Sequence, residues 1–248
     1  MVSRAPDRST LDSWLERRGD GEPLAWILGT VTFLGIPLRT DPGVYVPRAQ
    51  TEQLATRSSA LLPRRGMAAD LCTGSGAVAA YLMRSKPDAT VVGTDIDPAA
   101  ASCALRNGVN ATVADLDGPL RPGSFDLVTA VAPYVPREEL QFLPADVLRY
   151  EPREALDGGP GGTEVLARVV VAAARLLRPG GWLLTEIGGD QDTAVAPLLA
   201  GAGFALGELW RDEDGDLRGC SARFGRPAAS GPNRLPGTGR LGPAAPGT

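Results

Sequence analysis

Residues 68–82 read AADLCTGSGAVAAYL and decide the fold, because an apolar strand runs through a glycine turn directly into a helix. Gly74 and Gly76 stand in that turn, with Ser75 between them. Glycine there permits unusual backbone angles and lets a ligand approach the main chain. The turn predicts a nucleotide-type ligand, although a glycine-rich turn without a ligand has the same sequence. It also fits the dinucleotide pattern G-x-G-x-x-A, ending at Ala79.

Strands and helices alternate on both sides of this turn. This alternation predicts an α/β, Rossmann-like domain with a mostly parallel seven-stranded sheet that is covered on both faces. The last two strands follow each other through RDEDGD, which predicts an antiparallel hairpin at the edge of the sheet. The predicted strands are 67–72, 90–95, 111–114, 125–131, 181–187, 204–210 and 217–224, and the predicted helices are 76–85, 98–107, 163–178 and 191–201.

Four segments organise the chain. Residues 1–22 form a short N-terminal arm, in which Ser9 or Thr10 is expected to cap a helix that carries Leu11, Trp14 and Leu15 on one face. Residues 23–65 hold a short hairpin around Gly35 and a lead-in to a helix that starts near Gln50. The main domain is expected at 66–225. The tail at 226–248 is rich in Pro, Gly and Ala and is expected to be disordered.

The composition removes several classes of function. The 248 residues contain no histidine, which excludes Ser-His-Asp and Cys-His catalysis and metal sites that need imidazole, so no metal is predicted. The net charge is −4 and basic residues do not cluster, which argues against a nucleic-acid partner. No apolar run reaches membrane-spanning length, and residues 1–12 have no apolar core of the kind that a signal peptide needs, so none is expected. Three cysteines without paired spacing fit a reducing, cytoplasmic location.

Acidic residues stand at the ends of successive strands. Asp95 ends the second strand about twenty residues past the glycines, where an acid accepts hydrogen bonds from ribose hydroxyls. Asp97 is the better helix cap, which leaves Asp95 free for a ligand. Asp115 follows the third strand, near an adenine site or as a solvated loop acid. Asp70 precedes the glycines and suits an amino group better than a pyrophosphate, which weighs against the rival NAD(P) oxidoreductase.

Residues 21–224 resemble the HemK-type glutamine-N5 methyltransferases that modify peptide-chain release factors. The resemblance lies in segments that follow one another in the family's order. These segments are GEPLAWILGTVTFLGIPLRTDPGVYVPRAQTE at 21–52, DLCTGSGAVA at 70–79, VVGTDIDPAA at 91–100, FDLVTAVAPYVP at 125–136, EPREALDGG at 151–159, LRPGGWLLTEIGGDQ at 177–191 and GFALGELWRDEDGDLR at 203–218.

The resemblance implies a class I methyltransferase fold with S-adenosyl-L-methionine as its cofactor. It implies that the cofactor site is lined from the strand ends and covered by the segment around Arg48, Thr51 and Glu52. The residues implied at the cofactor are Arg48, Thr51, Asp70, Thr73, Gly74, Ser75, Gly76, Asp95, Ile96, Asp115 and Leu116.

The chain departs from the family at the acceptor motif. The Asn-Pro-Pro-Tyr signature reads Val131-Ala132-Pro133-Tyr134, and Cys72 stands where glycine is commoner. In the family the Asn side chain and the following carbonyl hold the substrate amide. Val131 has no polar atom, and losing such a bond costs about 1–3 kcal/mol, or roughly 10- to 100-fold in rate. The carbonyl of Ala132 and the ring of Tyr134 remain.

Only about 20 residues precede the matching region, where the family has a helical domain that docks its protein substrate. From both departures we expect a changed acceptor, an N or O nucleophile on a small molecule of secondary metabolism. Tyr134, Arg48 and Glu52 would line its pocket, with Glu52 as candidate proton acceptor, although Tyr134 could instead pack in the core. The alternatives are methylation of a glutamine in a release factor or another protein, the oxidoreductase and an inactive binding module. The sequence does not predict an oligomeric state.

Overall fold

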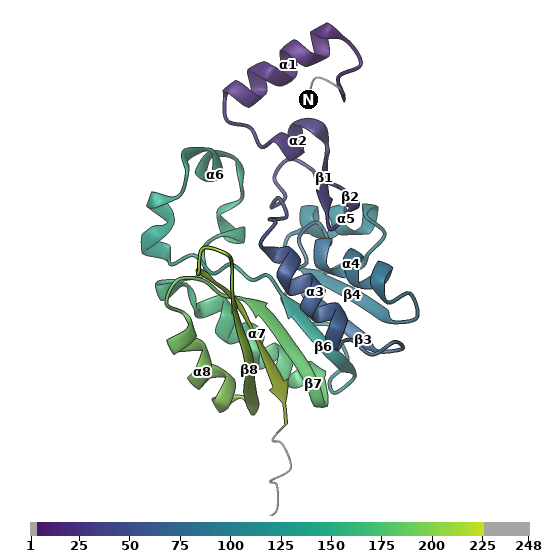
Figure 1. Ribbon diagram of the computed structural model, residues 1–248, viewed down its shortest axis with the longest axis vertical. Coiled ribbons are helices and arrows are strands. Elements are labelled where there is room, and N and C mark those ends of the chain that lie inside the picture. The colour runs from purple at the N-terminus through teal and green to yellow at the C-terminus, as the bar shows by residue number, and fades with distance from the viewer. Residues whose placement is uncertain (1–3, 226–248) are drawn as a thin grey trace, which may run out of the picture.

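The computed structural model describes residues 4–225, and the predicted disordered tail lies outside them. Seven strands form one sheet in the order β5-β4-β3-β6-β7-β9-β8 (Figure 1). The strands from β5 to β7 run parallel, while β9 is antiparallel to both β7 and β8, which confirms the predicted edge hairpin. The strands are β3 (Met67–Leu71), β4 (Thr90–Asp95), β5 (Asn110–Val113), β6 (Phe125–Ala130), β7 (Leu177–Glu186), β8 (Phe204–Arg211) and β9 (Leu217–Phe224).

Strand β7 begins four residues earlier than its apolar pattern predicts. Leu177 pairs with Phe125 before the register shifts, and regular pairing resumes between Trp182 and Leu127. The start of β7 could not be predicted from hydrophobicity, because Gly180 and Gly181 interrupt the apolar run.

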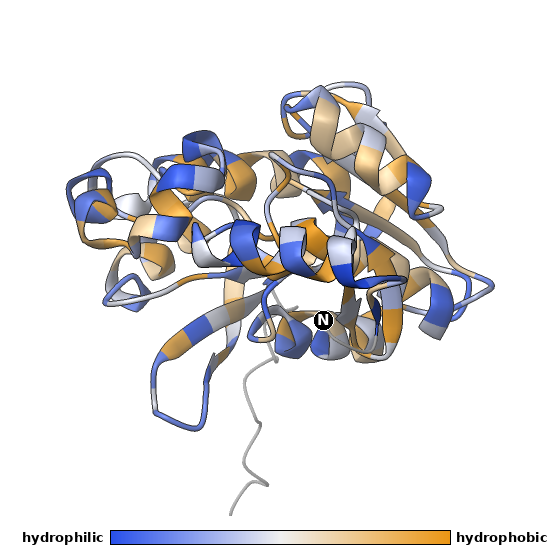
Figure 2. Cartoon of the chain, turned by 90° about the horizontal axis from the view of Figure 1, so that it is seen from above, coloured by the Kyte–Doolittle hydropathy of each residue, from blue (hydrophilic) through white to orange (hydrophobic). Residues whose placement is uncertain are grey.

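Helices cover both faces of the sheet. Apolar residues of α3, α4 and α5 share one buried cluster with the sheet, and those of α7 and α8 share another. Figure 2 shows hydrophobic and hydrophilic residues alternating along the helices, as expected of helices with one buried face. The helices are α3 (Thr51–Leu61), α4 (Ala77–Ser85), α5 (Pro98–Arg106), α7 (Glu164–Leu176) and α8 (Asp192–Gly201).

The part of the chain before the main domain differs from its prediction in three details. Helix α1 (Arg8–Gly19) is capped by the Asp7 side chain, which accepts from the Thr10 N–H, rather than by Ser9 or Thr10. Within residues 4–225 none of the α1 residues is buried, so its apolar face has no core to join. A short helix α2 (Leu24–Leu28) precedes the hairpin, and it was not predicted because five residues give no clear helical period. The hairpin itself is confirmed as β1 (Thr30–Phe33) and β2 (Ile36–Arg39).

An irregular segment connects β6 to α7 and lies beside the carboxyl ends of the parallel strands (Figure 1). No element was predicted here, because its helices are one or two turns long. They are η2 (Arg137–Phe142), α6 (Ala145–Tyr150), η3 (Arg153–Ala155) and η4 (Pro160–Gly162). A bridge between Val135 and Asp157 closes the segment on itself. Among residues 4–225 no helix is both long and apolar enough to cross a membrane.

Candidate active site

A cavity of about 800 Å³ opens at the carboxyl ends of β3, β4, β5 and β6. Open α/β sheets bind ligands at this edge. Its volume lies near the upper end of the range for small-molecule sites, about 300–1,000 Å³. The structure brings most of the predicted site residues together here: Thr51, Asp70, Thr73, Gly74, Ser75, Asp95, Ile96, Asp115, Leu116, Val131 and Pro133 all line the cavity.

Asp70 sits at the base of the cavity and is almost fully buried, with 2% of its surface exposed. Its two carboxylate oxygens accept hydrogen bonds of 2.7 Å from the hydroxyls of Thr73 and Thr129. Burial raises the pKa of Asp70 to about 6, because the loss of water outweighs these two hydrogen bonds. A positive amino group beside it would restore the charged form, so this carboxylate suits a cationic ligand group.

Asp95 holds the glycine turn in place. Its Oδ2 accepts from the Gly74 N–H at 2.8 Å and its Oδ1 from the Asp97 N–H at 3.0 Å. The Asp97 side chain caps α5 through the Ala99 N–H, as predicted. As predicted, Asp95 is not the cap of α5; each of its carboxylate oxygens accepts one backbone hydrogen bond, and these bonds tie it to the turn. Each carboxylate oxygen has further lone pairs, so Asp95 can still accept from ribose hydroxyls.

Asp115 forms an ion pair with Arg168 of α7 on the rim of the cavity, at 2.6 and 2.7 Å. Both side chains are about half exposed. The next strand-end residue on the other side, Ile96, is 64% exposed and lines the same cavity. An exposed branched apolar side chain beside polar groups provides a flat contact for an aromatic base.

The two glycines of the turn are required for different reasons. Gly74 has φ +56° and a Cβ there would meet nothing within 4 Å, so this position needs the left-handed conformation and leaves the backbone open to the cavity. Gly76 has φ +82°, and a Cβ there would lie 2.8 Å from Val109. Gly76 does not line the cavity. Gly76 therefore has the unusual backbone angle that the sequence predicts, and its lack of a side chain is needed for packing against Val109 and Ala104 rather than for ligand approach.

Cys72 also has a left-handed backbone, with φ +54°, which explains why glycine is commoner at this position. Burial raises the pKa of its thiol, so the side chain is a neutral group facing the cavity.

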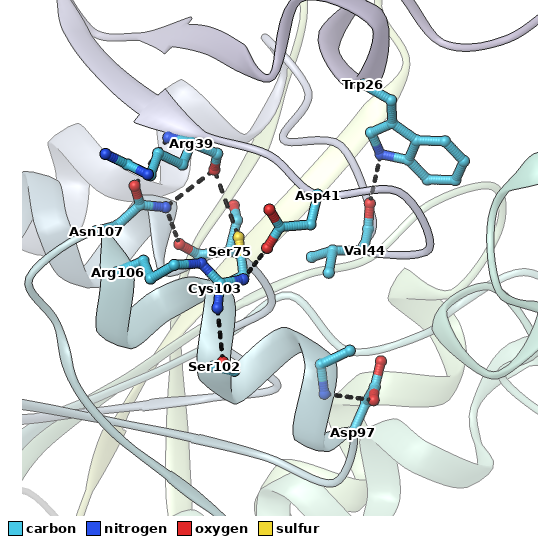
Figure 3. A network of polar contacts seen from close by, with 11 residues as sticks. Trp26, Arg39, Asp41, Val44, Ser75, Asp97, Ser102, Cys103, Arg106 and Asn107 are labelled. Carbon is cyan, nitrogen blue, oxygen red and sulfur yellow. Dashed lines mark hydrogen bonds and ion pairs between the residues drawn. The ribbon is translucent and has the colours of Figure 1, made fainter.

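The glycine turn is tied to the N-terminal hairpin through Asn107, the residue that ends α5 (Figure 3). Its Nδ2 donates to the carbonyl oxygens of Ser75 at 2.8 Å and Arg39 at 3.0 Å, and its Oδ1 accepts from the Arg39 N–H at 2.8 Å. An ion pair between Arg106 and Asp41 runs beside these bonds. The hairpin therefore positions the segment at 40–50 over the cavity.

Five predicted site residues do not line the cavity. Arg48 forms a two-oxygen ion pair with Glu151, at 2.6 and 2.7 Å. Glu52 accepts from the Leu34 N–H at 3.1 Å and so anchors the hairpin, which removes it as a candidate proton acceptor. Like Gly76, Ala132 is buried. Tyr134 lies behind the lining, and its hydroxyl accepts from Gln50 Nε2 at 2.9 Å.

Other lining residues were not predicted. Tyr45 and Pro47 come from the segment that follows the hairpin, and residues 152–155 and 157 come from the irregular segment after β6. Both segments belong to stretches that carry the family resemblance, which was the only available signal, because irregular loops have no periodicity.

The residues present fit S-adenosylmethionine. Asp70 would hold its amino group, Asp95 its ribose hydroxyls and Ile96 its adenine, while Gly74 leaves the main chain approachable. When bound, this group supplies a methyl on a positively charged sulfur.

Comparison with known proteins agrees with this fit. The methyltransferase domain family matches residues 68–150. A release factor glutamine methyltransferase of Geobacter sulfurreducens is 36% identical over 215 residues, covering 84% of this chain and 76% of that protein. One of Moorella thermoacetica is 42% identical over 202 residues, covering 76% and 70%.

Among solved structures, a 16S rRNA methyltransferase of T. thermophilus in complex with AdoMet and guanosine shares the fold. Its TM-score is 0.53 with 23% identity, over 79% of this chain and 44% of that chain. The enzyme is thus a methyltransferase that uses S-adenosylmethionine rather than a nicotinamide cofactor. The chain belongs to the HemK-type family, the release factor glutamine methyltransferases.

Proposed function

We propose that this enzyme methylates the side-chain amide nitrogen of a glutamine in a release factor. The observation that carries the proposal is the sequence relationship. Two relatives named for this activity are 36% and 42% identical over most of the chain. The small-molecule acceptor expected from the sequence has no counterpart in these relatives, so the protein acceptor becomes the first choice.

The cavity lining includes two groups of residues. The acids and the glycine turn fit the donor, and the less polar residues Tyr45, Pro47, Val131 and Pro133, called the acceptor region, fit the side chain of an acceptor. A glutamine side chain is an apolar stem with an amide at its tip, and its stem can pack against these less polar residues. A well-oriented acceptor contributes much of the rate of such a transfer.

Val131 sets the expected rate. Without a polar atom at this position, the acceptor amide lacks one side-chain hydrogen bond, which costs about 1–3 kcal/mol. The Ala132 carbonyl is present whatever the side chain. We therefore expect glutamine methylation that is slower than in relatives with asparagine at this position.

The same residue favours a second candidate, a small molecule with an amine or hydroxyl. Such a nucleophile has a localised lone pair and needs only proximity and alignment. An assay in which a small molecule and a release factor compete for the same enzyme separates the two candidates. If the true acceptor is a small molecule, it should be methylated at a far higher rate than any release factor.

The test incubates the full chain with tritiated S-adenosylmethionine and a purified bacterial release factor, followed by peptide mass spectrometry. We expect label on one glutamine of the release factor and none when that glutamine is replaced by glutamate. An Asp70→Asn variant controls for the donor site and should give little label. Failure of the wild-type chain to label the release factor, despite binding S-adenosylhomocysteine in calorimetry, would exclude the proposed acceptor.

A further inference from the structure

Glu186, the last residue of β7, is a buried acid that the donor site does not use. It is 4% exposed, and its Oε1 has no hydrogen-bond partner among residues 4–225. A buried carboxylate oxygen without a partner costs roughly 1–3 kcal/mol or more and calls for an explanation. Its position in the sheet offers one.

The register places Glu186 beside the acceptor motif. Ala130 of β6 pairs with Thr185 of β7, so Val131 and Glu186 are the next residues on the two neighbouring parallel strands. Leu184 and Val131 pack in the same cluster, on the face covered by α3. Because side chains alternate along a strand, Glu186 lies on the same face as Leu184. Glu186 therefore lies beside Val131 on this face of the sheet.

Thr51 connects this carboxylate to the cavity. Its side chain is in contact with Glu186 from the first turn of α3, and the same residue lines the cavity. The hydroxyl of a threonine can donate one hydrogen bond and accept another. Thr51 is therefore a lining residue placed to pass a proton from the acceptor region to Glu186.

The surroundings of Glu186 hold little compensating charge. Burial raises the pKa of Glu186 to about 7, and the contact with Thr51 and the positive charge of Arg218 on β9 offset only part of this rise. Two tyrosines face it, Tyr45 from the segment after the hairpin and Tyr134 from the loop after β6. Burial and the negative charge of Glu186 both raise the pKa of Tyr134, so both tyrosines stay neutral near pH 7. The positive charge of Arg48 is taken up by Glu151.

We propose that Glu186 is the terminal proton acceptor of methyl transfer and that the Thr51 hydroxyl relays the proton to it. This role rests on the proposed function, because it concerns a nitrogen acceptor that must lose a proton. The acceptor nitrogen forms a bond to the methyl carbon as the carbon–sulfur bond breaks, with its electron pair left on sulfur. The nitrogen gives its N–H proton to Thr51 Oγ1, whose own proton moves to the carboxylate of Glu186. The products are the N-methyl amide and neutral S-adenosylhomocysteine, and the carboxylic acid later releases its proton to water.

The chemistry needs such a group. An amide lone pair is delocalised, and removing the proton as the new bond forms keeps positive charge off the nitrogen. A base works best when its pKa lies near the working pH, and positioned bases contribute about 10²- to 10⁴-fold. The chain has no histidine to serve this purpose, and Glu52 is engaged by the hairpin.

The test compares Glu186→Gln, Thr51→Val and Thr51→Ser with the wild-type chain on a release factor. Glu186→Gln keeps the shape of the side chain and removes the base, so we expect kcat to fall about 100-fold or more. The activity that rises with pH near 7 should become flat, while the dissociation constant of S-adenosylhomocysteine should stay within about twofold. Thr51→Val should lose activity similarly, and Thr51→Ser should retain most of it. Glu208→Gln is the matched control, a half-exposed glutamate on β8 that does not line the cavity, and its replacement should leave the rise near pH 7 in place.

A second measurement needs no turnover. The infrared spectrum of the wild-type protein without donor should show protonated carboxyl bands of Asp70 and Glu186 at pH 6. The component that disappears with an apparent pKa near 7 should be absent in Glu186→Gln, whereas the Asp70 component, with a pKa of about 6, should remain. The outcomes are separable. A wild-type chain that labels no release factor overturns the proposed acceptor and the relay with it. An active wild-type chain whose rate and pH profile survive Glu186→Gln overturns only the role of Glu186, as does activity that survives Thr51→Val. If Glu186→Gln does not fold, the activity of Thr51→Val and the infrared titration of the wild-type protein test the role of Glu186 instead.

Discussion

Asn107 donates a 2.8 Å hydrogen bond to the carbonyl oxygen of Ser75, so the end of helix α5 fixes the glycine turn of the donor site. The same side chain also exchanges two hydrogen bonds with the Arg39 backbone. One amide thus couples the turn to the N-terminal hairpin. Such coupling can be measured by removing the amide.

Asn107→Ala should weaken donor binding and stability together. Three hydrogen bonds at a partly exposed position are lost, and we expect about 1–2 kcal/mol of unfolding free energy and roughly a tenfold weaker affinity for S-adenosylhomocysteine. Denaturant titration and calorimetry measure the two effects. Asn110→Ala, at the exposed start of β5, is the control and should change neither. Equal behaviour of the two variants would contradict the coupling.

Donor affinity should depend on pH through Asp70. The pKa of Asp70 is raised to about 6 in the protein without ligand, and the amino group of the donor is held only by the ionised form. Lowering the pH through about 6 protonates Asp70, so the affinity for S-adenosylhomocysteine should fall between pH 7 and pH 5. Calorimetry at several pH values measures this fall.

Asp70→Asn is the control for this pH dependence. It should bind roughly 10- to 100-fold more weakly at pH 7, because a hydrogen bond to a charged group contributes about 1.5–3 kcal/mol, and its affinity should vary little with pH. A wild-type affinity that is unchanged from pH 7 to pH 5 would remove Asp70 from the amino-group site.

Val131→Asn should raise the rate of glutamine methylation. The new amide would stand at the cavity wall where Val131 now lies, and it would restore a hydrogen bond to the acceptor that contributes about 1–3 kcal/mol, or roughly 10- to 100-fold in kcat/KM. Single-turnover assays with a release factor measure the gain. Val131→Thr adds a hydroxyl with little change in volume and controls for polarity alone. A lower rate with asparagine would show that this cavity is adapted to a different acceptor.

The two turn glycines should respond differently to alanine. Gly76→Ala places a methyl 2.8 Å from Val109 and 3.1 Å from Ala104 at a left-handed residue, and it should cost at least about 2–3 kcal/mol of stability. Gly74→Ala meets no atom within 4 Å, so only the backbone conformation is strained, at about 1 kcal/mol. Its main effect should be on donor affinity. Thermal unfolding with and without S-adenosylhomocysteine distinguishes the two patterns.

The main domain could be predicted from sequence because its signals are local. A few neighbouring residues are enough to indicate each of three features: the strand from Met67, the glycine turn and the capped helix after Asp97. The order of these elements along the chain then predicts the sheet. The position of the acids at one edge of the sheet could be predicted in the same way, because the carboxyl ends of parallel strands lie at the same edge. The start of β7 was misplaced because it depends on pairing with Phe125 across the sheet.

The partners of the site residues could not be predicted, because they come from distant parts of the chain. Arg48 meets Glu151, which is 103 positions away, and Gln50 meets Tyr134 across 84 positions. Nothing in the residues near Glu52 indicates that a backbone N–H in the hairpin would occupy it. Glu186 lies in the family-like stretch at 177–191, but its place in the site could not be predicted, because only the strand register places it beside Val131.

The ion pair between Arg48 and Glu151 has a consequence for evolution within the family. It joins two loops whose neighbouring residues Pro47 and Pro152 both line the cavity. This part of the lining is therefore held by an ion pair between loops rather than by the strand ends that hold the donor. Lengthening either loop, or replacing Arg48 or Glu151, would reshape the cavity for a different acceptor while leaving the donor's acids and glycines untouched.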